Sequence, residues 1–185
     1  MAELVFTSPI TRSYPRNEGA ALSLEDQTDQ AKVVVRAAEG TSARKALNVA
    51  FGQSRADGDV LVAGSRPDEW MLLGPHAAVQ AVAAGLPTDG HVSIVDWTHG
   101  RAAFRLSGAV ATSALEKICG IDWSDNMMPD GAVTSASVAV VTCDLVRNDV
   151  DGTPSYLILC DRSFGQYLFD AIIDACDEFG VDVTT

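Results

Sequence analysis

The sequence contains few basic residues for its length. Its 185 residues include 13 Lys and Arg against 25 Asp and Glu, which gives a formal net charge of −12. A nucleic-acid-binding surface needs clustered Lys and Arg to neutralise phosphates, so we expect no nucleic-acid partner. No run approaches the ~20 apolar residues of a membrane span, and residues 1–4 lack the basic start of a signal peptide. We therefore predict a cytoplasmic protein with no membrane partner.

Cysteine is also scarce, and its spacing excludes the usual cysteine-based sites. None of the four cysteines belongs to a C-x-x-C pair, and each lies inside an apolar segment: Cys119, Cys143, Cys160 and Cys176. A cysteine in such a segment usually behaves as a small buried hydrophobic residue. We expect four reduced, buried thiols, as is normal in the cytoplasm.

The common catalytic motifs are missing as well. There is no Gly-rich phosphate loop, no G-x-S-x-G nucleophile elbow and no H-E-x-x-H metal motif. The three histidines, His76, His91 and His99, are too far apart for a local metal site, so we interpret each as a surface or core residue. The sequence predicts no catalytic, cofactor-binding or metal-binding residue.

An acidic loop surrounds one of the tryptophans, Trp123. Its carboxylates are Asp122, Asp125 and Asp130, and they lack the D-x-[DN]-x-[DN]-G spacing of a calcium loop. We therefore expect a solvated loop.

Two successive segments show the same order of predicted elements. After an irregular arm at residues 1–30, apolar strands and capped helices follow in the order β-α-β-β-α-β over residues 31–98, and this order repeats over residues 99–185. In the first segment the predicted strands are 33–35, 60–63, 69–73 and 91–95, and the helices 43–51 and 75–84. In the second the strands are 102–106, 133–146 (one bent or bulged strand), 156–160 and 181–183, and the helices 109–119 and 164–179.

The repeat extends to local detail. Residues 64–75 and 151–162 each have a turn with proline, an aromatic residue that opens a strand, three aliphatic residues and an immediate helix start. This order is typical of the split-βαβ, or ferredoxin-like, unit. We predict an α+β fold of two ferredoxin-like βαββαβ units packed together. The alternative is one mixed α/β domain without a true repeat.

The polar corner between the two segments is the strongest candidate for chemistry. Asp96, His99 and Arg101 stand close together in an apolar background. A carboxylate, an imidazole and a guanidinium could bind an anion or relay a proton. Alternatively, Asp96 accepts hydrogen bonds from backbone N–H groups of the turn, and we favour this structural role.

A series of short motifs runs through the two segments. They are P-D-E-W-M-L-L-G (67–74), V-D-W-T-H-G-R (95–101), R-L-S-G (105–108), D-R-S-F-G-Q-Y-L (161–168) and E-F-G (178–180). The first three resemble passages of the folate-binding aminomethyltransferase superfamily, which includes the glycine-cleavage T-protein. The last two resemble the usual ending of a closer match, the gamma subunit family of heterotetrameric sarcosine oxidase.

The resemblance implies a non-catalytic subunit of an oxidoreductase complex. Such complexes demethylate sarcosine oxidatively to glycine and pass the one-carbon unit to tetrahydrofolate or release formaldehyde. The resemblance places FAD, FMN, NAD and tetrahydrofolate in the alpha and beta subunits and zinc in a small delta subunit. The gamma subunit resembles a truncated folate-binding aminomethyltransferase fold that packs mainly on the alpha subunit. The alternative is a stand-alone folate-binding protein or folate-dependent one-carbon enzyme, which would use Asp96 and Arg101.

An accessory subunit needs surfaces for its partners, and tryptophan is enriched at such surfaces. Trp70, Trp97 and Trp123 are therefore candidate interface anchors. Core packing is an equal alternative for Trp70, whereas the polar loop around Trp123 favours the interface. We also expect the arm at residues 1–30 and the Trp123 loop to become ordered only against a partner. A frayed terminus is the alternative for the arm.

Overall fold

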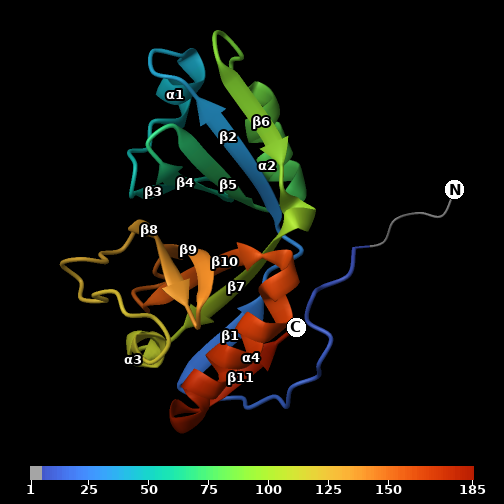
Figure 1. Ribbon diagram of the computed structural model, residues 1–185, viewed down its shortest axis with the longest axis vertical. Helices are drawn as coiled ribbons and strands as arrows, with labels where there is room; N and C mark the ends of the chain where they lie inside the picture. The colour runs from blue at the N-terminus through green and yellow to red at the C-terminus, as the bar shows by residue number, and fades with distance from the viewer. Residues whose placement is uncertain (1–5) are drawn as a thin grey trace, which may run out of the picture.

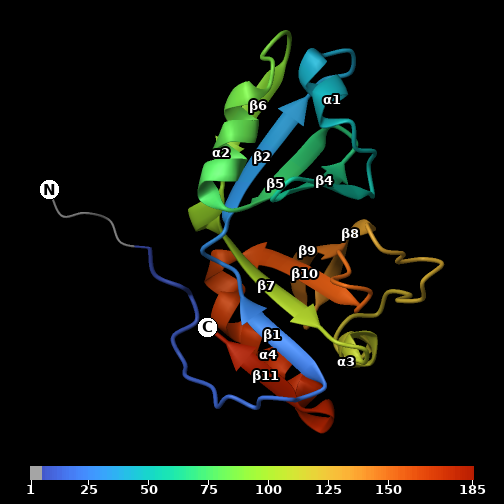
Figure 2. The same ribbon diagram turned by 180° about the vertical axis from the view of Figure 1, so that it is seen from behind.

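The computed structural model describes residues 6–185, which form two β-sheets that pack face to face (Figure 1, Figure 2). The small sheet has five strands, in the spatial order β3 (Ser54–Asp57), β4 (Val60–Arg66), β5 (Glu69–Gly74), β2 (Ala31–Ala37) and β6 (Val92–Asp96). The large sheet has six, in the order β11 (Val181–Thr184), β1 (Leu22–Asp26), β7 (Arg101–Ser107), β10 (Ser155–Asp161), β9 (Val141–Arg147) and β8 (Val133–Val138).

Helices cover the outer face of each sheet. The small sheet carries α1 (Ser42–Leu47) and α2 (His76–Gly85), and the large sheet carries α3 (Ala111–Glu116) and α4 (Gly165–Cys176). Short 3-10 helices complete the chain: η1 (Thr98–Gly100), η2 (Arg162–Phe164) and η3 (Asp177–Phe179). Thr41 caps the N-terminus of α1, because its hydroxyl accepts from the Arg44 N–H. None of the helices within residues 6–185 is long and apolar enough to cross a membrane.

The strand orders confirm the predicted pair of ferredoxin-like units. In the small sheet, β2-α1-β4-β5-α2-β6 has the strand order β4-β5-β2-β6, and β3 is added beside β4. In the large sheet, β7-α3-β9-β10-α4-β11 has the same plan, with β8 added beside β9. One further strand, β1, is inserted between β11 and β7, parallel to the first and antiparallel to the second.

Alternate residues of the central strands are buried against different layers. Val33 and Val35 point to the helices of the small sheet, whereas Val34 points to the large sheet. On β10, Ile158 packs under the helices of the large sheet and Leu157 packs between the sheets. Because both faces of each sheet are covered, these strands read as continuous apolar runs. Each fully buried side chain of this kind contributes roughly 1.5–3 kcal/mol to stability.

The N-terminal arm differs from its prediction. Irregular structure is found for residues 6–21, but Leu22–Asp26 is strand β1 of the large sheet, so the irregular arm to residue 30 is wrong there. The described part of the arm also does not need a partner to become ordered. It runs along α4 of its own chain, where Tyr14 donates to Asp170, and Arg16 then pairs with Asp182 of β11 at 2.7 Å (Figure 2). Residues 1–5 lie outside the described structure.

The apolar run at residues 133–146 also differs from its prediction. It forms a hairpin of two strands, β8 and β9, instead of one bent strand. The turn residues Ala139 and Val140 have φ values of 46° and 60°, a combination that is normally supplied by Asn-Gly. The sequence carries no turn signal at this point, so the hairpin could not be identified from turn residues.

Candidate functional site

The polar corner places Asp96 in the structural role that we favoured. One carboxylate oxygen accepts from the Thr98 backbone N–H at 2.9 Å, and the other accepts from the Gln80 amide at 3.1 Å. Hydrogen bonds from the Thr98 side chain and backbone hold the pKa of Asp96 below its usual range. This carboxylate therefore stabilises the turn between the two sheets.

The structure does not bring the three corner residues into one cluster. Arg101 is buried, and its guanidinium donates to the Asp144 carboxylate at 2.8 Å and to the Leu159 carbonyl at 3.0 Å. His99 is exposed, with its ring 5.7 Å from that of Phe6. Arg101 is thus committed to a buried ion pair and does not face a shared site with Asp96.

The other histidines occupy separate places. His76 begins α2, with its Nε2 2.7 Å from the Asp29 carbonyl, and His91 is exposed before β6. Over residues 6–185 no three His, Cys, Asp or Glu side chains form a group suited to a metal ion.

The acidic loop is tied down by hydrogen bonds. Asp122 accepts from the Ser124 N–H, Asp130 accepts from the Asp149 N–H, and Asp125 pairs with Arg147 at 2.5 Å. Each carboxylate thus has a local structural partner.

The tryptophans divide between core and surface. Trp123 is buried, with its ring edge-on to Tyr156 at 5.3 Å and its Nε1 donating to the Cys119 carbonyl. The predicted interface role of Trp123 is therefore wrong: the acidic residues are exposed while the indole between them turns inward. Trp70 is also buried and donates to the Val49 carbonyl. Trp97 remains 43% exposed.

The four thiols are free and buried, as predicted. Burial raises the pKa of Cys143 and of Cys160 to about 12. Such thiols carry almost no thiolate at neutral pH, so they are poor nucleophiles and poor metal ligands.

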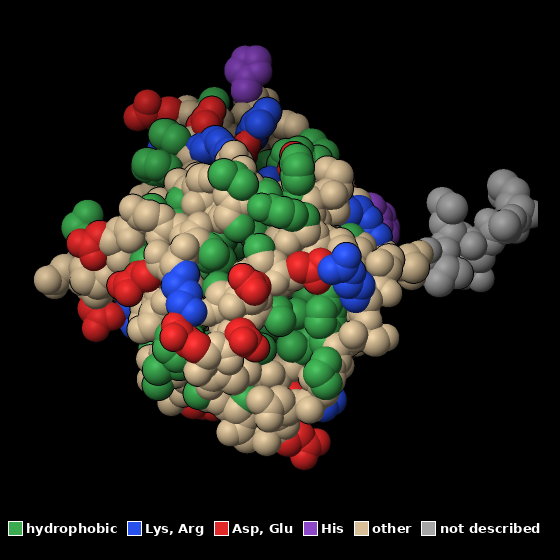
Figure 3. Space-filling model, turned by 60° about the horizontal axis from the view of Figure 1, so that its bottom comes forward, with side chains coloured by type: hydrophobic (Ala, Val, Ile, Leu, Met, Phe, Trp, Pro, Cys, Tyr) green, Lys and Arg blue, Asp and Glu red, His purple; other side chains and the backbone are tan. Residues whose placement is uncertain are grey.

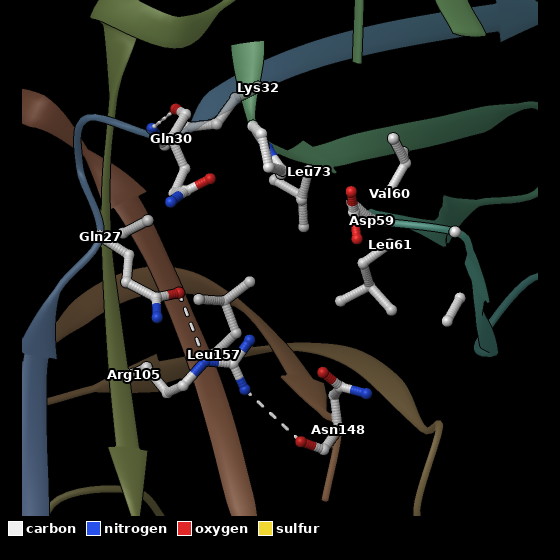
Figure 4. A pocket seen from close by; sticks show the side chains of 15 residues that line it. Gln27, Gln30, Lys32, Asp59, Val60, Leu61, Leu73, Arg105, Asn148 and Leu157 are labelled. Carbon is white, nitrogen blue, oxygen red and sulfur yellow. Dashed lines mark hydrogen bonds between the residues drawn. The ribbon is translucent and has the colours of Figure 1, made fainter. Parts of the chain in front are cut away.

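A cavity between the two sheets is the best candidate for a binding site (Figure 4). It has a volume of about 360 Å³, within the range of small-molecule pockets. Its walls come from the β1–β2 connection, the β3–β4 turn, the β5–α2 junction, and the strands β7 and β10. We call it the inter-sheet pocket. Its polar residues are Gln27, Gln30, Lys32, Asp59, Arg105 and Asn148.

Arg105 supplies positive charge to this pocket. Its Nε donates to the Gln27 side chain at 3.3 Å, and one terminal nitrogen donates to the Ser155 hydroxyl at 2.8 Å and the Asn148 carbonyl at 3.4 Å. These acceptors are uncharged. The carboxylate of Glu25, on the neighbouring strand β1, raises the pKa of Arg105 and so acts against the effect of burial. Burial lowers the pKa of Arg105, which shows that its charge is desolvated. An anion in the pocket would relieve this cost.

Lys32 also lines the pocket, but its ammonium is bound to backbone carbonyls of the β1–β2 connection. Its Nζ donates to the Thr28 carbonyl at 2.8 Å and to the Gln30 carbonyl at 2.6 Å. Burial lowers the pKa of Lys32 to about 8, although Asp29 and Asp26 nearby act in the opposite direction. The Lys32 ammonium is thus held by its own chain, and the positive charge of the pocket comes from Arg105.

The opposite side of the pocket is apolar and ends in a carboxylate. Leu61 and Leu73 line it, and Asp59 lies on the same side in Figure 4, whereas Leu157 lies beside Arg105 on the neighbouring strand. The rim is tight at Gly74, which has φ of 148° and where a Cβ would lie 2.5 Å from the Asp59 carbonyl oxygen. Together the walls suit a ligand with an apolar body and an anionic group.

Sequence reasoning missed both basic residues that line the pocket. Lys32 directly precedes the run Val33–Val35, and Arg105 alternates with Phe104 and Leu106 on a strand. A charged residue that flanks or interrupts an apolar strand can indicate a buried binding site, provided that both faces of the sheet are known to be covered. That knowledge required the packing of the two sheets against each other.

Comparisons with known proteins agree with this architecture. The family model described as "GCVT N-terminal domain" matches residues 37–184. One chain of the heterotetrameric sarcosine oxidase from Corynebacterium sp. U-96 superposes with a TM-score of 0.76 and 23% identity, over 89% of this chain and 88% of that chain. A comparison with curated protein sequences gave no significant match.

A full aminomethyltransferase is similar over part of its length. The glycine cleavage system aminomethyltransferase T from Bartonella henselae superposes with a TM-score of 0.66 and 13% identity, over 89% of this chain. This chain spans only 48% of that protein. At these identities the structural likeness establishes the fold, and the family match covers most of the sequence. The chain therefore belongs to the GCVT N-terminal domain family, with the fold of a truncated aminomethyltransferase.

Proposed function

We propose that this chain is a non-catalytic, gamma-type subunit of a heterotetrameric complex of the sarcosine oxidase kind. Such a complex demethylates sarcosine oxidatively to glycine, and the one-carbon unit passes to tetrahydrofolate or leaves as formaldehyde. The chain packs mainly on an alpha-type subunit, and beta- and delta-type subunits complete the complex. In this proposal the partners hold FAD, FMN, NAD, tetrahydrofolate and zinc, and the complex is cytoplasmic.

The extent of the structural match carries this proposal. The likeness spans 88% of a chain that is itself part of a heterotetrameric sarcosine oxidase, but only 48% of an aminomethyltransferase T. This chain therefore corresponds to nearly a whole subunit of the sarcosine oxidase and to about half of the aminomethyltransferase.

The corner residues support the same proposal. Asp96 accepts hydrogen bonds within its own turn and Arg101 pairs with Asp144, so both residues have structural partners. A subunit without its own catalytic constellation is what the proposal requires.

The experiment is to purify the tagged chain from the cells that naturally produce it. We expect it to co-purify in fixed stoichiometry with larger chains that carry flavin absorbance and oxidise sarcosine. Removing the chain from the complex should lower the stability of the complex while its flavin content per alpha and beta chain is unchanged. A chain that purifies alone, without flavin or larger partners, would refute the proposal.

A second candidate function is a folate-binding protein that acts alone, and the inter-sheet pocket is the observation that favours it. Tetrahydrofolate has a pteridine ring and a tail that ends in carboxylates. Arg105 could hold a carboxylate, the leucines could hold the ring, and Asp59 could accept from its amino group. Among the described residues 6–185, none that lines the pocket is aromatic, so ring stacking would not contribute.

This second candidate is tested by titrating 5-formyltetrahydrofolate into the isolated chain by calorimetry. Binding in the micromolar range that weakens at least tenfold in Arg105→Gln would favour it. The matched control is Arg12→Gln, because Arg12 is an exposed arginine on the N-terminal arm, outside the pocket. Absence of binding to the wild-type chain would reject the stand-alone folate protein and leave the subunit proposal untouched.

A further inference from the structure

The small sheet has a free edge at β6. Within residues 6–185, no strand pairs with the side of β6 that faces away from β2. The Trp97 N–H donates to the Lys32 carbonyl, and the His91 carbonyl accepts from Ala38, so the odd-numbered residues of β6 bond to β2. Neighbouring residues of a strand point their backbone groups to opposite sides. Val92 and Ile94 therefore present unpaired N–H and C=O groups to the outside.

The same edge carries exposed apolar side chains on one face. Val95 is 48% exposed and Trp97 is 43% exposed. Together with Val34, Arg36 and Ser93 they line a hollow of about 190 Å³. We call β6 and this hollow the β6 strip. Short strands, lysines and prolines commonly protect a free edge from pairing, and the segment Val92–Asp96 contains neither lysine nor proline.

The β6 strip continues an interface that already exists within the chain. Val34 belongs both to the hollow and to the cluster that packs the two sheets together. The large sheet packs on the inner face of the small sheet at strands β2, β4 and β5 but does not extend over the edge strand β6. The uncovered apolar face is therefore an extension of the inter-sheet packing surface.

The Trp97 side chain is held in place by contacts within its own chain. Its ring lies 5.6 Å from the Arg101 guanidinium, and a Cβ on Gly100 would come within 3.0 Å of the ring. A side chain at residue 100 would displace the indole. An aromatic anchor that is already ordered loses little conformational freedom on binding, which is the property of an interface hot spot.

We propose that the β6 strip docks an extended strand from a larger, less acidic partner chain. The strand pairs with the outward backbone groups of Val92 and Ile94 and places alternate apolar side chains against Val95 and Trp97. This inference rests on the proposed function, since it assigns the surface by which the subunit meets its main partner.

Charge favours a different chain over a second copy as the occupant. Each of two copies would carry a net charge of −12 over the whole chain, so the copies would repel each other as they approach. Figure 3 shows one face of the molecule, on which acidic and basic side chains lie among hydrophobic ones. A partner that is neutral or basic avoids this repulsion.

The test compares three tagged variants purified from the native cells with the wild-type complex. Val95→Lys places a charge in the hollow, and Ile94→Pro removes an outward N–H donor at a position where an edge strand tolerates proline. Phe51→Lys is the matched control, since Phe51 is 61% exposed and belongs to the small-sheet half of the chain but not to the strip. Circular dichroism and melting confirm that each variant is folded.

We expect both strip variants to lower the yield of co-purified partner at least tenfold, with Phe51→Lys unchanged. If the wild type forms the complex and Val95→Lys forms it equally well, the docking strip is wrong while the subunit proposal stands. If the wild type forms no complex, the proposed function itself fails. If the isolated wild type is a dimer that Val95→Lys converts to a monomer, the occupant is a second copy and the partner assignment is overturned.

Discussion

The buried pair of Arg101 and Asp144 offers a sharp test of the idea that Arg101 is structural. Asp144 accepts from Arg101 at 2.8 Å and from the Ser135 hydroxyl at 2.6 Å, and both ion-pair partners are buried. In Asp144→Asn the guanidinium keeps its charge but loses its counter-ion. Breaking a buried pair in this way costs about 3 kcal/mol. With a urea m-value of about 2 kcal/mol per M, the unfolding midpoint should fall by ~1.5 M.

A matched control is available on the same arginine. Asp161 lies 3.9 Å from Arg101, but its side chain is 68% exposed, so its attraction is screened by water. Asp161→Asn should leave the urea midpoint nearly unchanged, and the difference between the two variants isolates the buried pair. Equal midpoints for the two variants would refute the structural role of Arg101 and reopen its role in binding an anion.

Four further changes follow from the structure. Asp96→Asn should lower the free energy of unfolding in urea by up to about 1 kcal/mol. Because the pKa of Asp96 is lowered, its contribution to stability exists above pH ~3.9 and is lost as pH falls further; a variant as acid-sensitive as the wild type would contradict this. The pKa of Lys32 is lowered to about 8, so stability should rise from pH 8 towards ~10.4, where the unfolded chain binds more protons than the folded chain. This rise should vanish in Lys32→Met; a rise that persists in the variant would belong to another group. Cys143 and Cys160 should react with a thiol reagent only in denaturant, whereas rapid native labelling would show that they are accessible. Val140→Gly should stabilise the hairpin by roughly 0.5–1 kcal/mol by removing strain at φ 60°, and a loss of stability would mean that the turn does not need glycine.

The fold was largely predictable because its two halves repeat the same pattern. The alternation of apolar strands and capped helices identified both ferredoxin-like units. Strand β1 was missed because its alternation is short and it lies among polar residues, and only pairing with β7 and β11 makes Leu22–Asp26 a strand. Such pairing involves residues far apart in the sequence, which local patterns do not encode.

The candidate site was much less predictable. The cluster of Asp96, His99 and Arg101 exists in the sequence but not in space, because the chain turns at η1 and sends Arg101 into the core. Conversely, Lys32 and Arg105 are far apart in the sequence and meet at one pocket because the two sheets stack. Proximity in sequence predicts shared chemistry only when the residues lie on one element.

The central claim is that this chain is a subunit and not a complete functional protein. The most direct measurement is native mass spectrometry of the tagged chain purified from the cells that naturally produce it, with the flavin absorbance recorded on the same sample. The account predicts one dominant assembly that contains a single copy of this chain, larger flavin-bearing chains and sarcosine oxidase activity. A mass that corresponds to this chain alone, with no flavin and with bound folate, would contradict the account.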